Sequence, residues 1–196
     1  MNLTEMRARV REDLQDTDSQ NYRWTDDEVD GAIDRVVMEY SLHVPIEQQD
    51  DIATTDGDTE LDISSLASLL EIKSVEFPIG QTPKYLQRTE YWAGHLYMQD
   101  EGNGNDARVR WLKKHTLDAG STTIPEEHEE IIVLGATGYL AMSASAYTVD
   151  RASIAGRHAT INYKAWGKER LDRYDKKLKA VSRSSKVVPK ELYSED

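Results

Sequence analysis

The spacing of apolar residues changes twice along the chain, and these changes constrain the order of its elements. Near the N-terminus, apolar residues recur every three or four positions, which is typical of amphipathic helices. From about Gln49 they alternate with polar residues, as in strands that bury one face, and the helical spacing returns at about Pro125. The sequence therefore predicts an α+β chain, mainly α, in the order helices, strands, helices.

A capping sequence precedes each of two predicted N-terminal helices. Asn2 and Glu5 have the spacing of a capping pair, and Thr25 and Glu28 repeat it before the second helix. Trp24, just before the second cap, can pack on the following turn. The apolar faces that follow these signals are Leu3, Met6, Val10 and Leu14, and then Val29, Ile33, Val36, Val37 and Tyr40.

The middle of the chain combines strand alternation with turn residues. The stretch from Ile52 to Leu61, with Asp56-Gly57 at its centre, predicts a hairpin. Shorter alternating runs follow around Val75 and Phe77, Leu96 and Met98, and Val109 and Trp111. We expect these runs to form a small antiparallel β module.

Helices return near Pro125, where a proline in the first turn and the spacing of Thr123 and Glu126 mark a helix start. A last helix is expected over residues 153–182. The predicted organisation is an antiparallel helical bundle from residues 1–48 and 122–182, an inserted β module of residues 49–121, and a flexible C-terminal tail of residues 183–196.

The stretch Ile131–Ala141 (IIVLGATGYLA) resembles a glycine-rich loop for a dinucleotide when taken alone. Such a loop needs a preceding strand and a βαβ unit, and the sequence offers neither. Gly135, Gly138 and Ala141 are better interpreted as positions of close helix packing, where small side chains let a neighbouring helix approach.

Other chemical motifs are incomplete. Residues 16–18 resemble the start of a calcium loop, but Asn21 stands where that loop needs glycine. His128 begins a zinc-protease pattern whose partner position is Ile132. The chain has no cysteine, which excludes disulfides and thiolate chemistry. We expect no catalytic residues, no cofactor, no metal and no enzymatic activity.

The chain shows no signal for a membrane. Its N-terminus lacks the apolar region of a signal peptide, so the cytosol is the expected compartment. Residues 131–149 are uncharged, but they are rich in small residues, and a buried helix is the commoner structure for such a run.

Charge is distributed unevenly around a net value of −12. Residues 1–150 carry 12 Lys and Arg against 30 Asp and Glu, whereas residues 151–190 carry 12 against 3. The basic segment is either a solvated helix face or a docking element for an acidic or phosphate-bearing partner. The candidate docking residues are Lys164, Lys168, Arg173, Lys176, Lys177, Lys179, Arg183 and Lys186.

Two stretches and the order of elements carry a resemblance to a known family. Residues 9–14 (RVREDL) followed by 23–28 (RWTDDE) resemble the opening of the head–tail connector proteins of tailed bacteriophages, also called adaptor or head-completion proteins. Residues 123–129 (TIPEEHE) before a Gly/Ala-rich helix are also similar to that family.

The resemblance implies a structural role without catalysis. Family members assemble as a ring, typically a dodecamer, on the portal protein, extend the DNA channel and offer a surface to the tail or the next connector. A C-terminal segment commonly reaches the portal, and DNA passes without sequence-specific binding. The implied location is the neck of the virion, and the host cytoplasm during assembly.

Three other functions stay open at this stage. The chain could be a tail-completion or other phage structural protein that does not bind the portal. It could be a nucleotide-binding enzyme that uses Gly135-Ala136-Thr137-Gly138. It could also be a nucleic-acid-binding module that uses the basic helix, although the acidic body repels phosphate.

Overall fold

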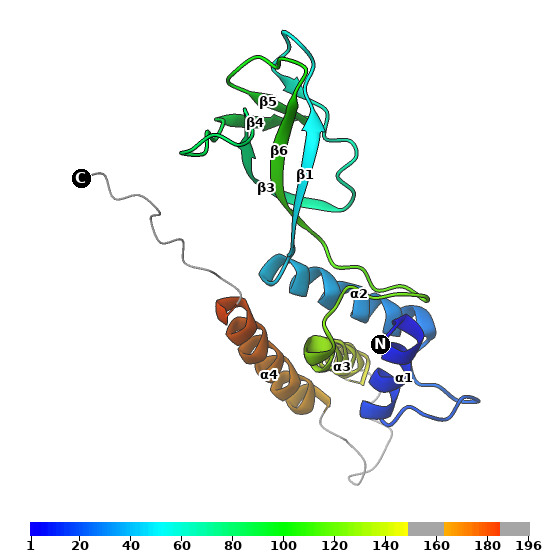
Figure 1. Cartoon of the computed structure of the whole chain (residues 1–196). Coiled ribbons are helices and arrows are strands. Elements are labelled where there is room, and N and C mark those ends of the chain that lie inside the picture. The colour runs from blue at the N-terminus through cyan, green and yellow to red at the C-terminus, as the bar shows by residue number, and fades with distance from the viewer. Residues whose placement is uncertain (149–162, 185–196) are drawn as a thin grey trace. The chain divides into compact units, whose positions relative to one another are not determined.

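The computed structural model describes residues 1–148 and 163–184. These residues form a mixed α+β fold of four α-helices, one short 3-10 helix and two small antiparallel sheets (Figure 1). The expected mixed α+β class is confirmed.

The chain divides into two compact units, a helical unit of Met1–Val44 with His115–Asp196 and a strand unit of Pro45–Lys114. The strand unit begins and ends earlier in the sequence than the expected 49–121. Its first strand has only three apolar residues in the stretch IEQQDDIA, so apolar alternation does not reveal where it starts.

Helices α1 (Leu3–Asp13) and α2 (Asp26–His43) begin at the expected caps. Asn2 accepts a hydrogen bond from the Glu5 N–H, and Thr25 accepts one from the Glu28 N–H; each glutamate side chain accepts a bond in return from the cap residue's own N–H. Both capping boxes are confirmed, because each satisfies amides that the first helical turn leaves unpaired.

Arg11 organises the connection between α1 and α2 from a buried position. Its guanidinium donates to Asp16 at 2.6 Å, to the Trp24 carbonyl at 2.9 Å and to Asp26 at 2.7 Å. The hydrogen bond from Arg11 lowers the pKa of Asp26 below its usual range. The side chain of Asp16 also accepts the Arg23 N–H at 2.8 Å. One arginine thus fixes the path of the whole connection.

The strand unit contains two antiparallel sheets (Figure 1). The first sheet has the order β1-β6-β3 and the second β2-β5-β4. The strands are β1 (Ile46–Ala53), β2 (Glu60–Leu61), β3 (Leu69–Glu76), β4 (Thr89–Trp92), β5 (His95–Met98) and β6 (Asp106–Lys113). Their core is a cluster of its own, built around Leu61, Val75, Phe77, Leu96, Val109 and Trp111.

The predicted hairpin from Ile52 to Leu61 is wrong. β1 pairs along its whole length with β6, and β2 pairs with β5 in the other sheet. The Asp56-Gly57 turn is present, with φ of 73° at Gly57, but Gly57 donates its N–H to Gly102 across the unit. The turn therefore carries the chain from one sheet to the other.

The second half of the helical unit contains η1 (Glu126–His128), α3 (Glu129–Thr148) and α4 (Tyr163–Ser184). The 3-10 turn starts after Pro125 as expected, but Thr123 does not cap it, since no side chain caps this turn. The Thr123 hydroxyl instead accepts the Thr116 N–H at 2.9 Å. Residues 153–162 of the predicted last helix lie outside the described residues.

Helix α3 is the central helix of this unit and contacts α1, α2 and α4 (Figure 1). The helical core includes Met6, Val10, Trp24, Ile33, Val36, Tyr40, Ile132, Leu140, Tyr174 and Leu178. Among the described residues, none of the helices combines the length and the apolarity that a bilayer crossing needs.

Helix α4 continues to Ser184, which corrects the expected end at 182 and the expected start of the tail at 183. Residues 185–196 of that tail, including Lys186, lie outside the described residues. At this end of the helix Val181 packs against the helical core and Ser182 is buried.

Candidate functional site

The candidate site is the exposed side of α4, and its position depends on how the other side packs. Tyr174 and Leu178 are buried in the helical core. The Tyr174 hydroxyl lies 3.3 Å from Glu39 of α2, which also accepts a hydrogen bond from Tyr139 of α3. Burial, with Glu39 nearby, raises the pKa of Tyr174, so this contact stays a neutral donor to a carboxylate. These contacts fix the rotation of α4 about its axis.

The small residues of α3 lie where the helices cross. A Cβ added at Gly135 would be 2.8 Å from Val36 of α2, and one added at Gly138 would be 2.8 Å from Leu171 of α4. Ala141 is fully buried, and its Cβ would be 3.0 Å from a Cβ added at Gly167. The glycines therefore lie inside a helix and against other helices.

Gly167 of α4 is a packing residue that sequence reasoning missed. A Cβ there would lie 3.1 Å from the Gly138 carbonyl and 3.2 Å from Met142. A glycine in a helix interior costs about 1 kcal/mol relative to alanine. The sequence could have indicated Gly167 on this ground, because a glycine within a predicted helix usually serves close packing.

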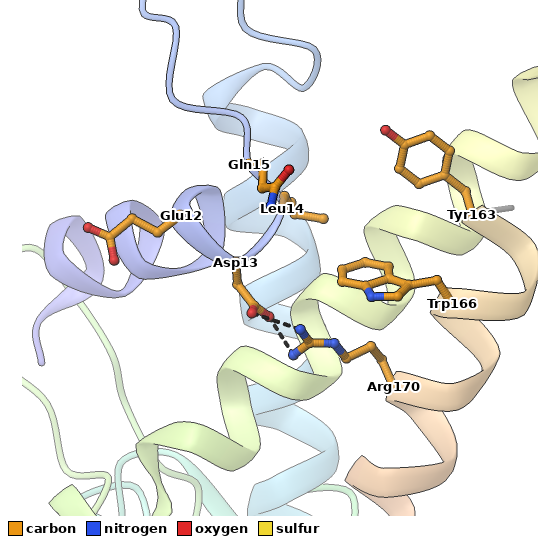
Figure 2. Close-up of a pocket in the computed structure, with 7 residues that line it drawn as sticks. All are labelled: Glu12, Asp13, Leu14, Gln15, Tyr163, Trp166 and Arg170. Carbon is orange, nitrogen blue, oxygen red and sulfur yellow. Dashed lines mark hydrogen bonds and ion pairs between the residues drawn. The ribbon is translucent and has the colours of Figure 1, made fainter. Parts of the chain in front are cut away.

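The beginning of α4 is held to the end of α1 by an ion pair. Arg170 Nη2 donates a hydrogen bond to Asp13 Oδ1 at 2.8 Å, and its Nη1 lies 2.6 Å from Oδ2 in the same ion pair (Figure 2). The Arg170 guanidinium also lies 4.7 Å from the centre of the Trp166 ring. Arg170 is therefore a basic residue of α4 whose charge is paired with α1.

A shallow cavity of about 400 Å³ lies beside this ion pair (Figure 2). It is lined by Glu12, Asp13, Leu14, Gln15, Tyr163, Trp166 and Arg170. Tyr163 contacts the α1–α2 connection. Its hydroxyl accepts a hydrogen bond from Arg23 at 2.7 Å, and its ring packs edge-on against Trp24. The charged lining residues have ionic partners, since Asp13 pairs with Arg170 and Glu12 pairs with Arg9 outside the cavity.

The outward side of α4 carries seven exposed basic side chains, which we call the basic face. They are Lys164, Lys168, Arg173, Lys176, Lys177, Lys179 and Arg183. Two of them pair within the helix, Arg173 with Glu169 and Lys179 with Asp175, both at 2.5 Å. Exposed pairs of this spacing contribute about 0.5 kcal/mol or less.

The remaining basic residues of the face make no ion pair within the described parts of the chain. Lys176 and Lys177 are adjacent in sequence and both exposed. Unpaired like charges on an otherwise acidic protein create a local positive potential, which attracts acidic or phosphate-bearing surfaces. The arrangement can therefore steer and orient a charged partner.

The weaker chemical candidates have structural roles in the described residues. Asp18 accepts bonds from the Gln20 N–H and the Asn21 amide, which lower its pKa, and Asp16 is bound by Arg11. No group of three or more His, Asp or Glu side chains in the described residues could hold a metal ion. His128 Nδ1 lies 2.6 Å from the Tyr40 hydroxyl instead of facing a metal site.

Comparison with known proteins adds little to this geometry. No model of a known protein family matches the chain. The curated histidinol-phosphate aminotransferase 2 of Pseudomonas aeruginosa is 24% identical over 161 residues, which cover 78% of this chain. The chain spans 41% of that protein's length. An identity this low over less than half of the aminotransferase does not place the chain in its family.

Proposed function

We propose that this chain is a structural protein of a tailed-phage virion, a head–tail connector that forms a ring on the portal protein. In this proposal its helices act as an antiparallel bundle with an inserted β module, the ring extends the DNA channel, and its far side receives the tail. The protein carries out no catalysis and needs no cofactor.

The observation that carries the proposal is the basic face of α4. It opposes the charge of the rest of the protein, and its lysines at 168, 176 and 177 are exposed without ion pairs in the described residues. Complementary charge across an interface contributes orientation and association rate more than affinity. An acidic portal surface is the partner that this chemistry favours in a connector.

The residues that carry the family resemblance support the proposal in a second way. Arg11 of α1 binds the Trp24 carbonyl in the α1–α2 connection, and Asp13 pairs with Arg170 of α4. These residues keep α4 in a fixed orientation, as a docking helix requires. Their roles are structural, which fits a family that transfers no catalytic residues.

The alternatives differ in what they bind. A tail-completion protein would not bind the portal, and a nucleic-acid-binding module would bind DNA with a steep salt dependence. The nucleotide-binding enzyme has the least support, because Gly135 and Gly138 lie within α3 and not in a loop. No described feature favours an aminotransferase.

The proposal is tested by mixing the protein with the purified portal from the same genome and imaging the mixture by electron microscopy. We expect a second ring stacked on the portal. A folded protein that never associates with the portal would overturn the connector assignment and favour the tail-completion alternative.

The role of the basic face is tested separately with two double variants of equal charge change. K176E/K177E reverses two unpaired charges on α4, and K73E/K114E reverses two exposed charges of the strand unit. We expect only the first variant to weaken portal binding. If both variants lose portal binding equally, the effect comes from the overall charge of the protein and not from this face. If neither variant loses binding, Lys176 and Lys177 do not take part in docking.

A further inference from the structure

Strand β4 of the second sheet has a neighbouring strand on one side only. It pairs with β5, and no described strand pairs with its other edge, because the order of this sheet is β2-β5-β4 (Figure 1). All four residues of β4 are exposed, and Trp92 and Tyr91 are 72% and 56% exposed. An exposed edge strand with apolar side chains is a template for pairing with another strand, because its outer backbone groups have no partner.

The backbone hydrogen bonds of β5 show which groups of β4 point outward. Thr89 of β4 faces Met98 of β5. Met98 donates its N–H to Thr59, on the side of β5 away from β4, so the pair of Thr89 and Met98 is not hydrogen-bonded. Bonded and non-bonded pairs alternate in an antiparallel ladder. The N–H and C=O groups of Thr89 and, two residues on, of Tyr91 therefore point to the free edge.

These outward groups are complementary to a second copy of the same strand. When two β4 strands meet antiparallel about a twofold axis at Glu90, Thr89 of each copy faces Tyr91 of the other. Each of these pairs can form two reciprocal N–H to C=O hydrogen bonds, so every outward group of both residues has a partner. Moving the axis to Tyr91 would place Thr89 against Ala93 in the turn, where φ is 52°, and these bonds would be lost.

The side chains favour the same register. On one face of the joined sheet, Arg88 lies opposite Trp92 of the second copy, a pairing that suits a cation–π contact. Arg88 is exposed and forms no ion pair within residues 1–148 and 163–184. The two Glu90 carboxylates meet at the axis, but each lies diagonal to the Arg88 of the other copy, whose charge offsets the repulsion. On the other face, Tyr91 lies beside the buried Leu96 of its own copy, so the pairing extends an apolar surface.

We propose that β4 is a self-association edge through which two copies of this chain join as a twofold antiparallel dimer. A four-residue strand buries far less than the roughly 1,600 Å² of a standard interface, so we expect a weak dimer, with a dissociation constant of about 10 μM to about 1 mM. A twofold contact joins two copies only, so it differs from a contact repeated around a ring. The inference does not depend on the proposed connector function.

A cysteine placed at the axis tests the register directly, because the chain has no cysteine of its own. In this dimer the two Glu90 residues form a non-hydrogen-bonded pair with Cα atoms about 4.5 Å apart, a separation that a disulfide spans. We expect full-length E90C to form a disulfide-linked dimer under mild oxidation, seen on a non-reducing gel. E47C is the matched control, at an exposed glutamate of edge strand β1, and should stay monomeric.

A proline variant separates edge pairing from folding. Thr89→Pro removes an outward N–H and leaves the hydrogen bonds from β4 to β5 in place, a position where edge strands tolerate proline. Sedimentation velocity of the full-length wild type from about 1 μM to about 1 mM should show a monomer–dimer equilibrium. We expect T89P to raise the dissociation constant by about tenfold or more, because each dimer loses two hydrogen bonds.

Trp92→Ser covers the case in which T89P fails to fold. The Trp92 side chain is largely exposed, so its loss should leave the circular dichroism spectrum unchanged while weakening the dimer. The proposal is overturned if the wild type stays monomeric up to about 1 mM, or if T89P and W92S both dimerise like the wild type. Equal linking of E47C and E90C, or larger assemblies that persist in both variants, would assign self-association to another surface and overturn it as well.

Discussion

At the scale of single residues, buried polar groups do more to define this protein than its motifs suggest. Arg11 shows this most clearly, since its side chain and that of Asp16 are 5% and 6% exposed. A buried ion pair is costly to break because the remaining charge stays without a partner. The sequence identified RVREDL as a family-like stretch, but nothing in it showed that Arg11 is the buried member and Arg9 the exposed one.

We expect Arg11→Ala to lower the free energy of unfolding by about 3–5 kcal/mol, because Asp16 would be left buried and unpaired. Arg9→Ala is the matched control on the same helix, since the Arg9–Glu12 pair is more than half exposed. We expect the control to cost less than about 1 kcal/mol in urea denaturation. Similar losses in both variants would contradict the special role of Arg11.

Tyr40 gives a prediction at alkaline pH. Burial raises its pKa from 10 to about 12. A raised pKa contributes stability that is complete below pH 10 and lost as pH rises toward 12, because the unfolded tyrosine ionises first. Wild type should therefore lose stability relative to Tyr40→Phe across this window in parallel denaturation series. A constant difference between the two proteins would show that Tyr40 ionises normally.

At the scale of elements, helix packing explains glycines that sequence patterns left ambiguous. The stretch GATG could be a phosphate loop or a packing surface, and helical context favoured packing. The sequence could not predict which residues pack on that surface, because Val36 and Leu171 lie on helices that are distant in sequence. Distance in sequence also explains why the predicted hairpin from Ile52 to Leu61 is wrong. β1 pairs with β6, and turn residues indicate only pairings between strands that follow one another in the chain.

Two glycine-to-alanine changes test this packing. In Gly138→Ala the new Cβ would lie 2.8 Å from Leu171 Cγ, so we expect a loss of about 1–3 kcal/mol in stability. In Gly31→Ala on α2 the new Cβ has nothing within 4 Å, so higher helix propensity should add up to about 1 kcal/mol. Thermal unfolding followed by circular dichroism measures both. The packing account fails if both variants shift stability in the same direction.

At the scale of the whole molecule, the chain enters and leaves the strand unit at neighbouring points. The Val44 carbonyl lies 2.9 Å from the His115 ring, and the two hydrophobic cores share no residue. Closely spaced ends and separate cores are typical of an inserted unit that can be removed.

Replacing residues 45–114 by about three Gly and Ser residues should leave a helical unit that unfolds cooperatively, because so short a linker can span the gap. The excised strand unit, residues 45–114, should also unfold cooperatively on its own. Far-UV circular dichroism in urea distinguishes a cooperative transition from a gradual one. A helical unit that collapses without the strands would show that its core depends on them.

The sequence by itself determined the order of elements, both N-terminal caps and the mixed α+β class, because caps and apolar periods are local signals within a few residues. Only the tertiary structure decided the sheet partners, the limits of the strand unit and the burial of Arg11, His115 and Gly167. Those features depend on contacts between residues 5 to 100 positions apart, as in the pairs Arg11–Asp16 and Tyr139–Glu39. A local pattern carries no information about which distant segment will supply the partner.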